Sequence, residues 1–249
     1  MELVIIILLE YIKENPNSEA GVAVAKILVQ NLEKITKMSL ESAADFCLCS
    51  PSTFSRFLKS LGIANFKELK KMVSSPRLVF HTDHYDKDGY AERVQKNINE
   101  IKAIADTVIK DIVLDLYNAK RVIFLAFPTN YAHLVDFQCK MMMNRKYIEV
   151  FSKQQMDDEH YQIDEGDLVF VISYQGNFFV ENSTNKKVNT KNAKKILITQ
   201  TPNISYSDFY KVIKCGSYNY YGEGSYALLF LLDRIYQEYS KFIASGVLY

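Results

Sequence analysis

The sequence holds 249 residues, of which 48% are hydrophobic and 24% are charged, and its formal net charge is +1. This balance is typical of a folded globular protein and excludes a disordered, collagen-like or polycationic chain. The length is sufficient for two hydrophobic cores. No apolar run is long enough to span a membrane, and Val4–Leu9 lacks the basic flank of a secretory signal. We therefore expect a cytoplasmic protein of about two domains, with no membrane partner.

The first seventy-odd residues predict a series of short helices. Asn15-Pro16-Asn17-Ser18 ends the first of them, and Gly62 ends the fourth. Ser39 and Ser50-Pro51 are typical helix starts, because serine accepts hydrogen bonds from free N–H groups and proline fits the first helical position. The apolar spacing places these helices at Leu3–Tyr11, Val24–Ile35, Leu40–Cys47, Ser52–Leu61 and Phe66–Met72.

The four cysteines are scattered along the chain, at Cys47, Cys49, Cys139 and Cys215. One residue separates the first two, not the two residues of a zinc-binding pair, and no second pair completes a site. We expect reduced, buried thiols, with no metal and no cofactor. His81 and His84 lie near aspartates, but in a polar stretch without periodicity, which favours a solvated linker over a metal site.

The chain beyond residue 89 alternates between apolar strand patterns and helical patterns. Such alternation predicts a mostly parallel sheet covered by helices on both faces. The expected strands are Arg121–Ala126, Tyr147–Phe151, Asp167–Ser173, Lys195–Thr199 and Tyr210–Lys214. The expected helices are Tyr90–Leu116, Tyr131–Met143, Val180–Lys194 and Ser225–Phe242.

Residues 39–57 have the pattern of a helix-turn-helix. Ala44 is a small residue where the first helix meets the second, and Phe54, Phe57 and Leu58 recur at the spacing of one buried helix face. The opposite face of the second helix carries short hydroxyl groups around basic side chains, which suit phosphates and base edges in a major groove. The residues that we expect to contact DNA are Ser50, Ser52, Thr53, Ser55, Arg56 and Lys59.

Basic residues are concentrated around this second helix. Residues 50–77 carry six lysines or arginines and one acidic residue, Glu68, which gives a local charge of +5 in a nearly neutral chain. Such a patch is the electrostatic footprint expected of a DNA-binding protein. An ordinary helical domain with a solvated charged face gives the same pattern, and spacing alone does not separate the two interpretations.

The segment from about Val24 to Met72 carries a set of residues that recurs in one family of proteins. These residues are Ala25, Ile27-Leu28, Asn31, Glu33, Ser39-Leu40, Ala44, Ser50, Thr53, Ser55-Arg56-Phe57, Leu61-Gly62-Ile63, Asn65-Phe66 and Glu68-Leu69-Lys70. With them the segment resembles the N-terminal domain of the RpiR family of bacterial sugar-responsive transcription regulators. Leu48 departs from the pattern, because the family often has glycine before the second helix. The resemblance implies a homodimer, or a dimer of dimers, that binds a palindromic operator in double-stranded DNA.

Regulators of this family carry a C-terminal sugar isomerase (SIS) domain, a doubly wound α/β fold that binds phosphosugars. The second half of the chain is similar to it at Asp167–Gly176, Lys195–Thr199 and Ser225–Asp233. The fold class implied is an α+β two-domain chain. An all-α helix-turn-helix domain at residues 1–75 precedes a linker at residues 76–89. An α/β doubly wound parallel-sheet domain follows at residues 90–249.

The expected phosphate loops depart from the family pattern. Ala126, Pro128 and Asn130 stand where the family tends toward Gly-x-Gly-x-Ser, and Gln175 and Phe178 replace hydroxyl residues of the second loop. Phosphate cradles need close backbone N–H groups, and proline removes one donor. Three interpretations stay open: a phosphosugar site, a site for another small polar ligand with Tyr131 or Tyr174 stacking on it, or a dimerisation scaffold. The ligand-binding candidates are Thr129, Asn130, Ser173, Gln175 and Gly176.

An SIS-fold isomerase needs a base, for which His133 and Glu223 are the candidates. Because the phosphate loops are altered and fold similarity does not carry activity across, we expect no enzyme and assign no catalytic residue. The sequence therefore predicts a transcriptional regulator that responds to a phosphosugar or similar small polar metabolite. The alternative is an SIS-fold isomerase or sugar-binding module whose helical domain serves only for assembly.

Overall fold

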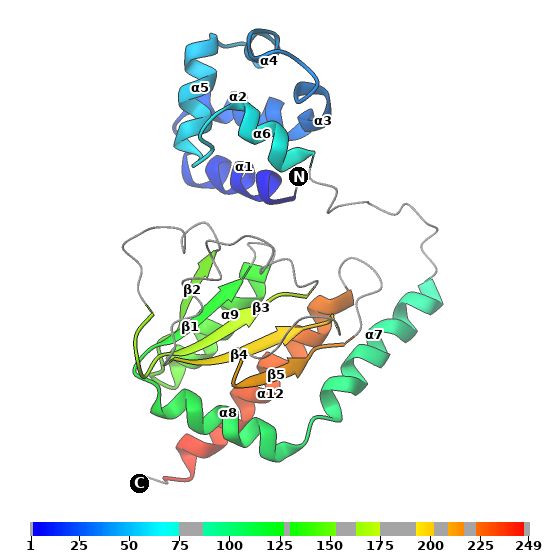
Figure 1. Ribbon diagram of the computed structural model, residues 1–249, viewed down its shortest axis with the longest axis vertical. Helices are drawn as coiled ribbons and strands as arrows, with labels where there is room; N and C mark the ends of the chain where they lie inside the picture. Colours follow the sequence, from blue (N-terminus) through cyan, green and yellow to red (C-terminus); the bar gives the residue numbers. More distant parts are fainter. Residues whose placement is uncertain are drawn as a thin grey trace. The chain divides into compact units, whose positions relative to one another are not determined.

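The computed structural model describes residues 2–74, 87–126, 130–152, 163–174, 193–201, 209–216 and 223–246. The chain divides into two compact units, Met1–His81 and Thr82–Tyr249, and each has its own hydrophobic core (Figure 1). None of the described helices is long and apolar enough to cross a membrane. The linker predicted at residues 76–89 lies mostly outside the described residues. A helix begins at Lys87, so the last residues of the predicted linker are helical.

The N-terminal unit is built from helices packed around one core. Phe54, Leu58 and Leu69 are fully buried in it. The predicted stripe Val24–Ile35 forms two helices, because the Asn31 side chain donates to the Ile27 carbonyl (2.9 Å) and the chain turns there. The helices are α1 (Glu2–Glu14), α2 (Glu19–Gln30), α3 (Leu32–Ile35), α4 (Leu40–Phe46), α5 (Pro51–Ser60) and α6 (Phe66–Val73).

In the described residues of the C-terminal unit, five strands form a fully parallel sheet in the order β2-β1-β3-β4-β5. All five predicted strands are present. The predicted helix Val180–Lys194 lies outside the described residues except at its end, where Lys194 pairs with Leu168 as the first residue of a strand. The strands are β1 (Val122–Ala126), β2 (Glu149–Ser152), β3 (Leu168–Ile172), β4 (Lys194–Thr199) and β5 (Lys211–Lys214).

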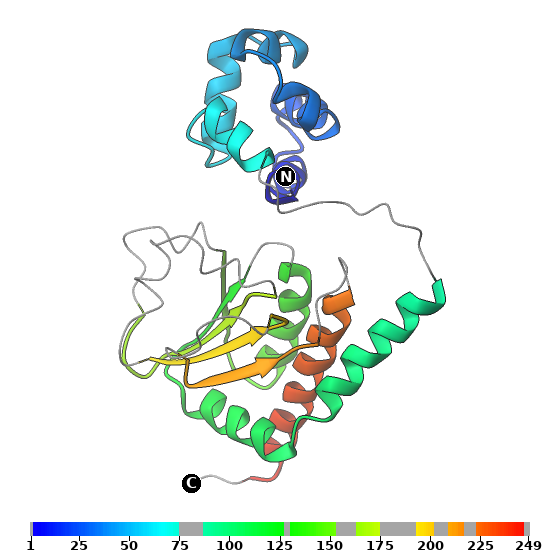
Figure 2. The same cartoon turned by 45° about the vertical axis from the view of Figure 1, so that its right-hand side comes forward.

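Four helices of this unit are described, and they pack on one face of the sheet, as Figure 2 shows for α9 and α12. Phe124 and Phe170 stack beneath them with ring centroids 4.4 Å apart. Alternate strand residues, among them Leu125 and Val171, are equally buried on the opposite face. Both faces of the sheet are thus buried, but the described helices cover only one of them, so the expectation of helices on both faces stays a prediction for the other. The helices are α7 (Lys87–Lys102), α8 (Asp106–Asn118), α9 (Tyr131–Met143) and α12 (Glu223–Ala244).

The single helix predicted over Tyr90–Leu116 is wrong, since the chain forms α7 and α8 with a break between them. Arg234 on α12 explains the break. Its guanidinium donates to the Ile101 carbonyl (2.6 Å) and the Ile104 carbonyl (2.7 Å) and pairs with Asp106 (2.6 Å). The arginine therefore binds carbonyls that a continuous helix would use internally.

Candidate functional site

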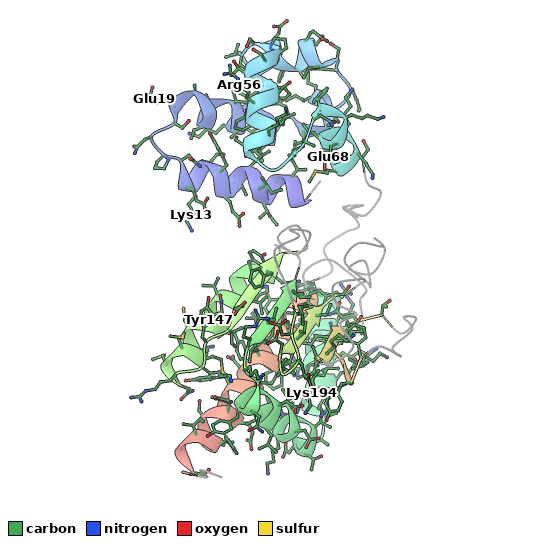
Figure 3. The ribbon with its side chains drawn as sticks, turned by 60° about the vertical axis from the view of Figure 1, so that its left-hand side comes forward. Lys13, Glu19, Arg56, Glu68, Tyr147 and Lys194 are labelled. Atoms are coloured by element: carbon green, nitrogen blue, oxygen red, sulfur yellow. The ribbon has the colours of Figure 1, made fainter. Side chains whose placement is uncertain are left out.

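The outer face of α5 carries most of the residues expected to contact DNA. Phe54, Phe57 and Leu58 are buried and fix the inner face of the helix. On the outer side Ser52, Thr53, Arg56 and Lys59 are exposed, whereas Ser55 is half-buried at the edge. Figure 3 labels Arg56 on this helix. The predicted residues therefore form one solvent-facing surface, with Ser55 at its margin.

Ser50 has a structural role at the start of α5. Its Oγ accepts a hydrogen bond from the Thr53 N–H (3.2 Å) and lies 3.0 Å from the Ser52 hydroxyl. Ser39 caps α4 in the same way, through the Ser42 N–H (3.1 Å). Pro51 occupies the first turn, where its missing N–H costs nothing. These caps set where both helices begin, so Ser50 positions the outer face of α5.

The basic patch extends from α5 onto α6. Lys67 and Lys71 are exposed. Lys70 is half-buried and engaged: its Nζ donates to the Met38 carbonyl (2.6 Å) and lies over the Phe66 ring at 4.9 Å. Arg77, which contributes to the predicted charge of +5, lies outside the described residues. The exposed cations of the described patch are thus Arg56, Lys59, Lys67 and Lys71.

Leu48, in the turn between α4 and α5, has a backbone φ of +57°. The turn closes with hydrogen bonds from the Leu48 N–H to the Asp45 carbonyl and from the Cys49 N–H to the Ala44 carbonyl, each 3.0 Å. This left-handed geometry at a helix end favours glycine. The side chain of Leu48 is 85% exposed, so no packing compensates for the strained backbone.

A second candidate site lies at the carboxyl edge of the sheet. The strand order reverses direction between β1 and β3, and ligands of such sheets bind where the order reverses. Asn130 follows β1 and Ser173 follows β3, and both are buried. The Asn130 side chain makes no capping bond to α9. Thr129, Gln175 and Gly176 lie outside the described residues.

Residues at the carboxyl end of β4 extend this edge, although the sequence analysis did not single them out. The Thr199 hydroxyl donates to the Ser173 carbonyl (2.8 Å), and the Gln200 N–H donates to the Tyr174 carbonyl (3.0 Å). Gln200 is buried, and its side-chain N–H donates to the Cys215 carbonyl (2.8 Å). These bonds lock the ends of β3, β4 and β5 together. No sequence motif marks them, because each depends on strands paired across the sheet.

Tyr174 was expected to stack on a ligand in one interpretation. Its ring instead packs against the core beneath the helices. Burial, together with the nearby Cys215, raises the pKa of its hydroxyl well above the ordinary value, so the phenol stays neutral. Tyr174 is therefore a core residue that anchors the end of β3.

An ion pair ties β1 to β3 at the opposite, amino-terminal edge of the sheet. Asp167 is buried, and its carboxylate accepts hydrogen bonds from Arg121 Nε (3.1 Å), Arg121 Nη2 (2.5 Å) and the Asp164 N–H (2.7 Å). Burial raises the pKa of Asp167, but these hydrogen bonds and the charges of Arg121 and Lys120 outweigh it and hold the pKa below its ordinary value of 3.8. The pair fixes the two strands that carry Asn130 and Ser173.

Candidate catalytic and metal-binding groups are sparse in the described part of the chain. His133 on α9 is half-buried, and burial lowers the pKa of its imidazole. The side chain of Glu223, and also His81 and His84, lie outside the described residues. Within the described ranges no group of three or more His, Cys, Asp or Glu side chains could hold a metal ion. All four cysteines are free, and Cys139 is exposed, which corrects the expectation that all are buried.

Comparison with known proteins identifies the C-terminal unit. Residues 115–215 match the family model of the SIS domain. Among curated proteins, none matches this chain.

Three solved structures illustrate the similarity. A protein of Escherichia coli CFT073 in complex with a phosphosugar is 11% identical, with a TM-score of 0.53 over 63% of this chain and 89% of that chain. A Methanococcus jannaschii protein, for which 3-hexulose-6-phosphate isomerase function is inferred, is 16% identical, with a TM-score of 0.51 over 63% and 92%. The Vibrio vulnificus NanR protein complexed with ManNAc-6P is 15% identical, with a TM-score of 0.49 over 98% and 97%. The C-terminal unit of this chain contains an SIS domain.

Proposed function

We propose that this protein is a cytoplasmic, DNA-binding transcriptional regulator that responds to a phosphosugar or a similar small polar metabolite. The outer face of α5 carries the proposal. This helix is capped at Ser50 and fixed by three buried side chains, and it exposes Arg56, Lys59 and the hydroxyls of Ser52 and Thr53. A helix with such a face fits the major groove, where arginine and short hydroxyl groups contact guanine edges and phosphates. In this proposal α4 and α5 are the two helices of a helix-turn-helix.

The SIS domain supports the second half of the proposal. Its candidate site, with Asn130 and Ser173 at the point where the strand order reverses, is a position that favours small polar ligands. The similar Escherichia coli structure holds a phosphosugar. Pro128 removes a backbone N–H donor from the loop after β1, which weakens the case for a phosphate there. The proposed ligands therefore include small polar metabolites other than phosphosugars.

DNA binding is tested by fluorescence anisotropy of the full chain with the DNA upstream of its own gene, against a scrambled duplex of equal length. Affinity is measured at about 50 mM and about 200 mM salt, since phosphate contacts make specific binding fall steeply with ionic strength. The proposal predicts preference for the native fragment. Equal and weak binding to both fragments, unchanged when sugar phosphates are added, contradicts it.

An SIS-fold isomerase or binding module, with the helical unit used for assembly, is the second candidate. The inferred isomerase function of the similar Methanococcus jannaschii structure favours it. It predicts turnover or tight binding of a sugar phosphate without salt-sensitive affinity for DNA. His133→Ala then abolishes turnover, whereas the regulator predicts no turnover to lose.

A further inference from the structure

A cavity of about 440 Å³ lies between α2 and α5 in the N-terminal unit. It forms because α2 presents the small residues Ala20, Gly21 and Ala23 there, so no long side chain fills the space beside α5. Figure 3 labels Arg56, which lines the cavity from α5. At about 30 Å³ for each non-hydrogen atom, the volume that one molecule takes in liquid water, the space holds about 15 such atoms, the size of a small metabolite.

The walls of the cavity are mostly apolar and fixed. Ile27 lines it from α2, and the buried Phe57 lines it from α5. Tyr11 on α1 meets the Phe57 ring edge-on, with ring centroids 5.2 Å apart. Two of the lining hydroxyl groups, those of Thr53 and Ser60, already form hydrogen bonds within their own segment (2.9 and 2.7 Å). The walls therefore favour an apolar ligand over one with many hydroxyl groups.

Leu48 adds a strained apolar wall. It lines the cavity, its side chain is 85% exposed, and its backbone φ of +57° costs energy in a leucine. Strained residues are concentrated at binding sites, where the strained conformation has a use. An apolar ligand in the cavity would cover the Leu48 side chain, a contact that glycine cannot make.

The charge of the cavity comes from one cation. Among the described residues that line it, Arg56 alone is charged. Its guanidinium has no ion pair or hydrogen bond within the part of the chain that the structure describes, unlike those of Arg121 and Arg234. The charged residues that neighbour the lining are of both signs and exposed to water, which weakens their effect. They are Glu10, Glu19, Lys26, Asp45 and Lys59.

We propose that this cavity binds a small apolar monocarboxylate, with the carboxylate paired to Arg56 and the apolar body against Leu48 and Ile27. The planar guanidinium suits a carboxylate, which it can bind through two parallel N–H···O bonds. A sugar phosphate does not suit this site, because its hydroxyl groups would lose water to apolar walls. The cavity is thus separate from the ligand site proposed in the SIS domain.

The consequence for DNA binding rests on the proposed function, in which Arg56 contacts DNA. A carboxylate bound to the guanidinium competes with a phosphate or a guanine edge for the same N–H groups. The ligand therefore lowers DNA affinity within the helical unit itself. By linkage, DNA lowers the affinity for the carboxylate by the same factor.

Calorimetric titration of the full chain with naphthalene-2-carboxylate tests the site. The matched probe is naphthalene-2-carboxamide, which has the same shape and no charge. We expect a dissociation constant of about 1 mM or lower for the carboxylate and affinity at least tenfold weaker for the amide. Arg56→Gln should abolish this difference. No binding of the carboxylate at about 5 mM, or equal affinity for both probes in wild type, overturns the proposal.

Three variants test where the probe binds. Ala23→Phe fills the cavity from α2, and Gln30→Phe adds the same ring at an exposed position of α2 outside the lining. We expect Ala23→Phe to weaken carboxylate binding at least tenfold and Gln30→Phe to change it less than about twofold. Leu48→Gly should weaken binding although it relieves backbone strain, a combination that partial unfolding cannot give. Equal effects of the two Phe variants place the probe elsewhere and overturn the proposal.

Alkylation by iodoacetamide, followed by mass spectrometry, gives a second readout. Cys49 lines the cavity and is half-buried, whereas Cys139 is exposed in the C-terminal unit and serves as an internal control. Burial and the nearby charge of Asp45 raise the pKa of Cys49, so the reaction is run at about pH 9. The carboxylate probe should slow alkylation of Cys49 and leave Cys139 unchanged. An unchanged rate at Cys49 in saturating probe contradicts binding in the cavity.

DNA anisotropy separates this proposal from the proposed function. If both hold, saturating carboxylate probe weakens binding to the native upstream DNA at least tenfold in wild type and not in Ala23→Phe. A chain that binds the probe and protects Cys49 but binds no DNA keeps the cavity and refutes the regulator. A chain that binds DNA but not the probe refutes the cavity alone, and DNA affinity unchanged by saturating probe refutes the competition at Arg56.

Discussion

The ion pair between Arg121 and Asp167 gives a prediction that can be worked from the structure. Asp167→Asn removes the negative charge that accepts three hydrogen bonds just before β3. The amide NH₂ group of the new side chain would face the N–H donors of Arg121 or Asp164, with which it cannot form a hydrogen bond. Breaking a buried ion pair costs about 3–5 kcal/mol. Arg121 keeps 34% of its side chain exposed and can rehydrate, which favours the low end. We expect the C-terminal unit to lose about 3 kcal/mol of stability, a factor of about 150 in its unfolding equilibrium.

Hydrogen exchange measured by mass spectrometry reports each unit separately in the full chain. In Asp167→Asn, peptides from β1 and β3 should exchange about 100-fold faster, whereas peptides from α5 keep their wild-type rates. Asp164→Asn is the matched control. Asp164 lies 3.4 Å from the same guanidinium but is 68% exposed, so its loss should cost less than about 1 kcal/mol. If Asp164→Asn and Asp167→Asn increased the exchange rates of β1 and β3 equally, the claim that burial makes the Asp167 ion pair the stronger one would be refuted.

Three further predictions concern pH, the turn before α5 and the end of β4. Because the folded-state pKa of Asp167 lies below its ordinary value of 3.8, its stabilisation is complete above about pH 5 and is lost as pH falls through the folded-state pKa; the thermal midpoints of wild type and Asp167→Asn should converge between about pH 5 and pH 2. Leu48→Gly should stabilise the N-terminal unit by about 1 kcal/mol in urea titrations, and an equal gain from Leu48→Ala would contradict backbone strain as the cause. A Cβ at Gly224 would collide with the side-chain amide of the buried Gln200, so Gly224→Ala should cost about 2 kcal/mol, and an unchanged urea midpoint would contradict it.

Local signals in the sequence predicted the elements that local chemistry determines. The serine caps at Ser39 and Ser50 placed α4 and α5 within a residue or two, because a cap is a contact between neighbours in the chain. The short apolar runs of β1 and β3 predicted buried strands, because a strand that is covered on both faces needs apolar side chains at every position. The outer face of α5 followed from the burial of Phe54 and Phe57, which set the opposite side of the helix.

Contacts between distant residues explain what the sequence did not predict. The break between α7 and α8 depends on Arg234, about 130 residues further along the chain, and the apolar spacing continues across it. The bonds that join Ser173, Thr199 and Gln200 exist only once β3 and β4 pair. The exposure of Cys139 likewise depends on which side of α9 faces the sheet.

The most direct test of the regulator is the affinity of Arg56→Ala for the native upstream DNA, measured by anisotropy beside wild type and Lys13→Ala. Lys13 is an exposed cation on α1, labelled with Arg56 in Figure 3, so the control removes the same charge away from α5. The account predicts that Arg56→Ala weakens binding more than tenfold, about 1.4 kcal/mol or more, and narrows the preference over scrambled DNA, whereas Lys13→Ala changes affinity less than about threefold. Unchanged affinity in Arg56→Ala, or an equal loss in both variants, would contradict DNA recognition by α5.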